Sequence, residues 1–187
     1  MADIFMSFIH EEGLVAESIQ DFIGKLFGEA ASVFRSSDEG AIYAGDDWMA
    51  KIITELSTAK VLISILSPNS ISRPWINFEA GAAWINKIKV IPVCVGGLKI
   101  ADLPKPYSSL QGVEIDTHDG AYYLASSIAH HLNIDISRKP LFGAWQGAGA
   151  ILSGRDPEEE KRLSIPYNSL VSFLELYIFD PPADASK

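Results

Sequence analysis

The chain has 187 residues, which is enough for one domain with a hydrophobic core and an appendage. Hydrophobic residues make up 48% of the sequence, a share that excludes an intrinsically disordered protein. The formal net charge is −9, from 24 acidic and 15 basic residues, and no basic run occurs. A large surface that binds nucleic acid independently of its sequence is therefore excluded. An anionic small molecule can still bind through backbone amides and one or two local bases.

The sequence indicates a reducing compartment and no membrane attachment. Cys94 is the only cysteine, so no intrachain disulfide can form, and its apolar neighbours predict a small buried side chain. The chain starts without a basic leader and has no apolar run of membrane-spanning length, so we expect a cytoplasmic protein. We expect no metal site, because the histidines lack the spacing of metal ligands; they are His10, His118, His130 and His131.

The first half of the chain alternates apolar strands with amphipathic helices. Asp3–His10 predicts a buried strand, and apolar residues at helical spacing from Val15 to Leu26 predict a helix after it. A short second strand is predicted at Ala31–Phe34. The stretch Arg35–Trp48 reads as a polar loop with two glycines and four acids, and loops this long in compact domains tend to be functional. A second helix is predicted at Asp47–Thr58.

The same alternation continues in the second half. The branched apolar run Val61–Leu66 predicts a fully buried strand. Turn-forming residues follow it, and Trp75–Trp84 predicts a helix with Pro74 in its first turn, where the missing amide hydrogen costs nothing. The remaining predicted elements are a strand at Val90–Val95, a short strand at Gly112–Asp116 and a last helix after Gly120.

Strands that alternate with helices predict a parallel sheet, covered on both faces through right-handed crossovers. Five such units, complete by about residue 136, predict an α/β domain with a flavodoxin-like, doubly wound, five-stranded parallel sheet over residues 1–136. Residues 137–187 are predicted to form a C-terminal extension that packs on this domain or mediates self-association. The extension carries no motif that indicates a function.

Glu79 is the main candidate for a functional side chain. It is the single acid in the helix predicted at Trp75–Trp84, which follows the loop at the end of a strand. Ligands of doubly wound folds bind beyond the carboxyl ends of the strands, and Trp75 lies one turn earlier on the same helix face. Most glutamates are nevertheless solvated, and a lone tryptophan is as often part of the core as a ligand platform. The spacing alone leaves both interpretations open.

Three blocks of the sequence together resemble the signature of a bacterial TIR (Toll/interleukin-1 receptor) domain. They are DIFMSF at the start, the polar loop ending in GDDW, and SPNSISRPWINFEAGAAW. The spacing of Trp75 and Glu79 resembles the motif that bears the catalytic glutamate in TIR domains that consume NAD. The resemblance spans about Asp3 to Ile136. It implies the TIR fold and an NAD glycohydrolase or ADP-ribosyl cyclase that acts in anti-phage defence, self-associates, and signals to a downstream effector.

The resemblance also implies the chemistry of the site. Nicotinamide leaves NAD as a neutral molecule, so no general acid has to protonate it, and one carboxylate suffices to stabilise an oxocarbenium-like transition state. Glu79 would be that carboxylate, and Trp75 would stack on the nicotinamide or frame the pocket. NAD would be the substrate rather than a retained cofactor, because no GxGxxG fingerprint follows the first strand.

Further residues are implied as substrate-binding. Ser7 and Phe8 would lie at the floor of the crevice, at the end of the first strand. Arg35 would meet the phosphates and Asp46 a ribose, although surface pairing of the arginine and helix capping by the aspartate are equally consistent with the sequence. Trp48 would either line the site or anchor the second helix.

Two other classes of protein share this architecture. A TIR adaptor assembles with other TIR domains without turnover, and such members commonly lack an acid at the position of Glu79. A phospho-receiver domain needs acids at the ends of the first and third strands. This chain has Ser7, Phe8 and Ser67 at those places, which excludes that class.

Overall fold

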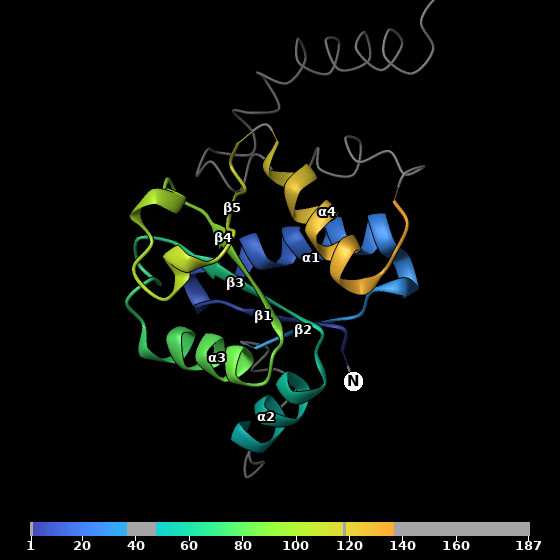
Figure 1. The fold of residues 1–187 in the computed structure, drawn as a ribbon, viewed down its shortest axis with the longest axis horizontal. Coiled ribbons are helices and arrows are strands. Elements are labelled where there is room, and N and C mark those ends of the chain that lie inside the picture. Colours follow the sequence, from blue (N-terminus) through green and yellow to red (C-terminus); the bar gives the residue numbers. More distant parts are fainter. Residues whose placement is uncertain (1, 37–47, 118, 137–187) are drawn as a thin grey trace, which may run out of the picture. The chain divides into compact units, whose positions relative to one another are not determined.

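The computed structural model describes residues 2–36, 48–117 and 119–136. At the centre of this region lies a parallel sheet of five strands in the order β2-β1-β3-β4-β5 (Figure 1). The strands are β1 (Ile4–Ser7), β2 (Val33–Arg35), β3 (Val61–Leu66), β4 (Lys89–Cys94) and β5 (Val113–Glu114). The predicted flavodoxin-like, doubly wound α/β fold is thus confirmed, and the change of winding direction falls between β1 and β3.

In the described residues, four α-helices and several short 3-10 turns lie between the strands or, for α4, after the last one. The α-helices are α1 (Gly13–Phe27), α2 (Trp48–Thr58), α3 (Pro74–Ile85) and α4 (Gly120–Leu132). The 3-10 turns are η1 (His10–Glu12), η2 (Gly28–Ala30), η4 (Ile100–Asp102) and η5 (Tyr107–Ser109). None of the helices in the described ranges is long and apolar enough to cross a membrane.

Some element boundaries differ from the predicted ones. The first strand ends at Ser7 rather than His10, because the chain turns there into the 3-10 turn η1. Arg35, predicted to open the long loop, is the last residue of β2 and lies opposite Met6 of β1. Residues 37–47 of that loop, and the predicted extension at 137–187, lie outside the described residues.

The two faces of the sheet are covered by different helices (Figure 1). Helices α1 and α4 pack on one face, over a cluster that includes Met6, Ile63 and Val93. Helices α2 and α3 pack on the other face, over Phe5 and Leu62. Every residue of β3 is buried, as expected for the central strand of a sheet covered on both sides.

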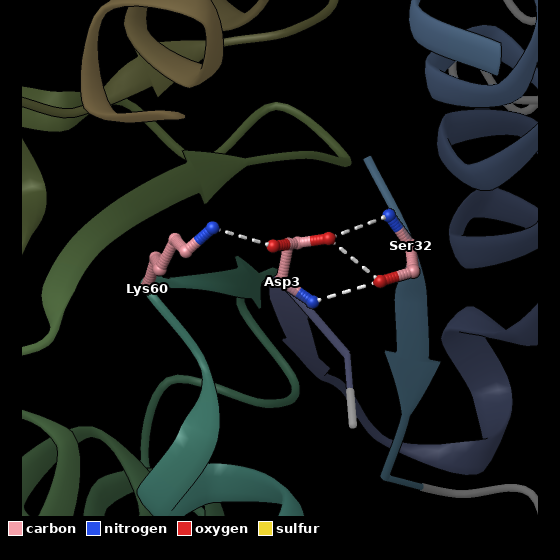
Figure 2. A network of polar contacts seen from close by, with 3 residues as sticks. All are labelled: Asp3, Ser32 and Lys60. Atoms are coloured by element: carbon pink, nitrogen blue, oxygen red, sulfur yellow. Dashed lines mark hydrogen bonds and ion pairs between the residues drawn. The ribbon is translucent and has the colours of Figure 1, made fainter. Parts of the chain in front are cut away.

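A polar network fastens the amino ends of three strands (Figure 2). The Asp3 carboxylate accepts hydrogen bonds from Lys60 Nζ at 2.8 Å and from Ser32 Oγ at 2.8 Å, and the Asp3 backbone N–H donates to Ser32 Oγ at 3.0 Å. These residues immediately precede β1, β2 and β3. Hydrogen bonds from Lys60 and Ser32 hold the pKa of Asp3 below its usual range. The network therefore fixes the end of the sheet that lies opposite the candidate site.

Candidate functional site

The candidate site lies at the carboxyl ends of the strands, where a tight loop leads from β3 into α3. Ser67 Oγ accepts hydrogen bonds from the N–H groups of Asn69 and Ser70, and Ser70 Oγ accepts one from the N–H of Ser67 at 2.8 Å. Arg73 then adopts an extended backbone, as a residue before proline prefers, and Pro74 takes the first helical position. The local sequence therefore fixes where α3 begins.

The Glu79 carboxylate is fully buried between α3 and the sheet, with an exposed fraction of 0%. The Ser7 hydroxyl, at the end of β1, donates a hydrogen bond to Glu79 Oε2. The Trp75 indole Nε1–H, one turn earlier on α3, donates to Glu79 Oε1 at 2.9 Å. Each carboxylate oxygen thus has its own donor, and the position of the group is fixed from two sides.

Burial makes Glu79 an unusual acid. Loss of water raises the pKa of its carboxyl from 4.5 to about 7, because the charged form is penalised in the protein interior. Hydrogen bonds from Ser7, Trp75 and Ser36 oppose this rise. At neutral pH the carboxyl group is therefore present in both its charged and its neutral form. A pKa close to the working pH is typical of carboxyl groups that act in catalysis.

Trp75 connects this buried carboxylate with the surface. Its side chain is half-buried and packs against the core beneath α2 and α3. Its ring also stacks on Phe78, with centroids 5.3 Å apart and an interplanar angle of 29°. Because Phe78 is 49% exposed, two aromatic rings in contact lead from solvent to Glu79.

Tyr107 connects α3 with the central strand β3. Its hydroxyl donates to the carbonyl oxygen of Ile76 at 3.3 Å and lies 3.3 Å from Ser64 Oγ on β3. All three side chains are buried. Sequence reasoning missed Tyr107, although Ser64 gave a signal, because a hydroxyl within a fully buried strand requires a polar partner.

A second buried carboxyl, Glu12, lies at the same ends of the strands. Burial raises its pKa, and the hydroxyls of Ser67 and Ser70 oppose this rise. Its Oε2 accepts a hydrogen bond from the N–H of Ile9 at 3.4 Å, whereas its Oε1 has no hydrogen-bond partner among the described residues. Glu12 therefore joins the turn after β1 to the loop before α3. Sequence reasoning treated it only as the end of the first strand.

The structure brings some of the predicted residues together. Ser7 and Trp75 both contact Glu79. Phe8, predicted beside Ser7 at the floor of the crevice, instead packs in the core on the α1 side. Phe8 follows the last residue of β1 and belongs to the same buried cluster as Met6, whereas the Ser7 side chain contacts Glu79 of α3.

Arg35 and Trp48, two further predicted residues, belong to β2 and α2. Arg35 is half-buried at the end of β2, next to the buried Ser36. Trp48 begins α2. Asp46 lies outside the described residues. Within the described ranges, no group of three or more histidine, cysteine, aspartate or glutamate side chains could hold a metal ion.

Comparisons with known proteins give one family match and several structural matches. The family model described as TIR domain matches residues 4–126, which is more than half of the chain. No curated protein matches this chain. A metazoan TIR-STING receptor from C. gigas is similar in two solved structures, at 18% and 19% identity and with TM-scores of 0.50 and 0.51. The second of these contains 2',3'-cGAMP.

These matches concern the fold. The alignments cover 71% of this chain but only 40% and 39% of the two receptor chains, so this chain spans less than half of their length. The TIR domains of the activated Roq1 resistosome, which recognises the pathogen effector XopQ, align at 16% identity with a TM-score of 0.41. That alignment covers 78% of this chain and 96% of the Roq1 chain.

Proposed function

Since this chain belongs to the TIR domain family, we propose that it is an enzyme that cleaves the bond between nicotinamide and ribose in NAD, with Glu79 as the catalytic carboxylate. One observation carries the proposal. Glu79 is fully buried at the carboxyl ends of the strands, and a donor from β1 and another from α3 hold its two carboxylate oxygens. Ligands of doubly wound folds bind at these strand ends.

The chemistry needs an anion at a fixed place. As the bond to nicotinamide breaks, positive charge develops on the ribose, and nicotinamide departs with the bonding electrons as a neutral molecule. A carboxylate in a region with little water stabilises that charge more strongly than it would in solvent. The ionised form of Glu79 is therefore the active one. A cationic substrate nearby also favours that form and lowers its pKa.

Substrate access requires a change at Trp75. Glu79 and Ser7 both have an exposed fraction of 0%, whereas Trp75 is half-buried and faces solvent through Phe78. We therefore expect the ribose hydroxyls to replace the indole N–H as donors to Glu79 Oε1, while Ser7 keeps its hydrogen bond to Oε2. The displaced indole ring is then free to stack on the nicotinamide.

Roles for the other residues remain part of the proposal. Arg35 would meet the phosphates, Asp46 a ribose, and Trp48 the wall of the site. Attack by water would give ADP-ribose, and attack by the substrate's own adenine would give a cyclic ADP-ribose that signals to an effector in bacterial anti-phage defence.

A TIR adaptor without turnover is the second candidate. The observation in its favour is that Glu79 is fully buried and hydrogen-bonded within its own chain, as a purely structural residue would be. Turnover separates the two candidates directly.

The test incubates the purified full chain with NAD and measures the release of nicotinamide by chromatography. Mass spectrometry then identifies the second product. We expect turnover by the wild type and a loss of at least about a hundredfold in Glu79→Gln, because an electrostatic contact at the reacting centre supplies this order of rate. Glu17→Gln, which changes an exposed acid on α1, is the matched control and should retain full activity. Equal turnover in Glu79→Gln and wild type would refute the assignment.

A further inference from the structure

Apolar contacts alone do not determine how α3 lies on the sheet. Its inner residues Ile76, Ala80 and Ala83 are buried, but Phe78 and Trp84 on its outer side are 49% and 52% exposed. A helix with apolar side chains on both sides has no single apolar stripe that selects the face turned toward the sheet. The hydrophobic effect is also non-directional, so it tolerates a helix that rotates or slides. Polar contacts therefore have to hold α3 in one position.

A layer of buried hydroxyl groups lies beneath α3. Ser7 of β1 and Ser64 of β3 are register partners, and each follows by two positions a residue that faces α3, Phe5 and Leu62 respectively. Side chains two positions apart in a strand share a face, so both hydroxyls lie on the α3 side of the sheet. Two positions further along β3, Leu66 belongs to a second apolar cluster. The hydroxyls are therefore enclosed by apolar side chains on both sides.

Tyr107 adds a third hydroxyl to this layer and joins it to α3. Its side chain is buried in the same apolar cluster as Ile76. Its one hydroxyl hydrogen is donated to the carbonyl oxygen of Ile76, so the Ser64 hydroxyl, 3.3 Å away, has to donate to the Tyr107 oxygen. Burial raises the pKa of Tyr107, the hydrogen bond from Ser64 lowers it, and the charge of Glu79 raises it again. The tyrosine and the carboxylate therefore interact through the same dry region.

The contact with Ile76 is placed where it controls the candidate site. Ile76 lies between Trp75 and Glu79 on α3, so a bond to its carbonyl oxygen holds the turn that carries both. We propose that Tyr107 is a positioning residue for the reaction, a step that rests on the proposed function. Together with Ser64, it sets the rotation of α3 and its position along β3, and so places the Glu79 carboxylate. Tyr107 acts through the backbone of α3 and not on the substrate.

Tyr107→Phe removes the hydroxyl and keeps the ring, so it tests this role in the full chain. We expect kcat for nicotinamide release to fall about tenfold or more, since a small displacement of a reacting group has this effect, and KM to stay unchanged. Tyr123→Phe, the same change at a tyrosine of 58% exposure on α4, is the matched control and should retain full activity. A wild-type kcat in Tyr107→Phe, or a loss confined to KM, would overturn the proposal.

The double variant Ser64→Ala/Tyr107→Phe separates positioning from a general loss of stability. Tyr107→Phe alone leaves the Ser64 hydroxyl buried without its acceptor, which destabilises the fold, whereas removal of both polar groups leaves no such hydroxyl. In urea unfolding the double variant should therefore be more stable than the single variant, but it should keep the low kcat. Recovery of kcat together with stability would show that Tyr107 only supports the fold, and the proposal would be wrong.

Nuclear magnetic resonance of the Trp75 indole N–H tests the position of α3 without turnover. This proton is hydrogen-bonded to Glu79 in the wild type, and Trp75→Phe identifies its signal by its loss. Tyr107→Phe should shift the signal and speed its exchange with water, and Tyr123→Phe should leave both unchanged. An unchanged signal in Tyr107→Phe would overturn the proposal. A wild type without any turnover rejects the proposed function, and this signal still decides whether Tyr107 positions α3.

Discussion

Replacement of Glu79 by glutamine should make the protein more stable above neutral pH. Glutamine has the same shape, can accept the hydrogen bond of the Trp75 indole, and can donate to the Ser7 hydroxyl. It therefore keeps both contacts without a buried charge. Glu79 has its pKa raised by burial, so its folded state binds a proton that its unfolded state has already released.

This difference in bound protons determines that the stability of the wild type falls as the pH rises. Below about pH 4.5 the carboxyl is neutral in both states and costs the folded protein nothing. As the pH rises from 4.5 toward about 7, the wild type loses stability, and above about 7 the loss is complete. One pKa unit corresponds to about 1.4 kcal/mol, so the full loss is roughly 3 kcal/mol. About 2 kcal/mol of it falls between pH 5.5 and 8.

Urea unfolding of the wild type and of Glu79→Gln, at pH 5.5 and at pH 8, measures how the free energy of unfolding of each protein changes with pH. The variant should gain about 2 kcal/mol relative to the wild type between the two pH values. All other titrating groups are shared by the two proteins, so they cancel in the comparison. A stability difference that stays constant over this pH range would show that the Glu79 carboxyl does not titrate near 7, and the account of a desolvated acid would be wrong.

Three further predictions follow from the contacts and the packing. Ser7→Ala removes a hydrogen bond that favours the charged form of Glu79, so the rise of kcat/KM with pH, expected through about 7 in the wild type, should shift to higher pH. A uniform loss at all pH values would show that Ser7 acts only in packing. Gly120→Ala should destabilise the fold by about 2 kcal/mol or more, as measured by urea unfolding, because its methyl group would clash with the backbone carbonyl oxygen of Glu114. Gly81→Ala, in open space, should instead gain about 0.5–1 kcal/mol in the same assay, and equal effects of the two substitutions would contradict the packing described for them.

The sheet could be predicted because its strands have clear sequence patterns. An apolar run such as Val61–Leu66 has few alternatives to a buried strand, and Pro74 marks the start of its helix. Alternation of strands and helices then determines parallel pairing and the doubly wound arrangement. Boundaries were less accurate, as at Ser7, where a turn replaces the last residues of the predicted strand.

Contacts between distant residues could not be predicted. The family resemblance implies Ser7 near the site, but the sequence does not indicate its hydrogen bond to Glu79, because the two residues are 72 positions apart in the chain. Tyr107 reaches the α3 backbone across 31 residues, and no local pattern indicates that contact. The burial of Phe8 in the core, by contrast, agrees with the apolar run in which the sequence places it.

The lengths of the outermost strands restrict how copies of this protein can join. The sheet ends in β2, with three residues, and in β5, with two, and such short borders offer few free backbone groups to an incoming strand. Growth by adding strand to strand, as in amyloid, is therefore disfavoured for the described domain. Ordered assemblies of the described domain should therefore rest on contacts between side chains, and should come apart again on dilution.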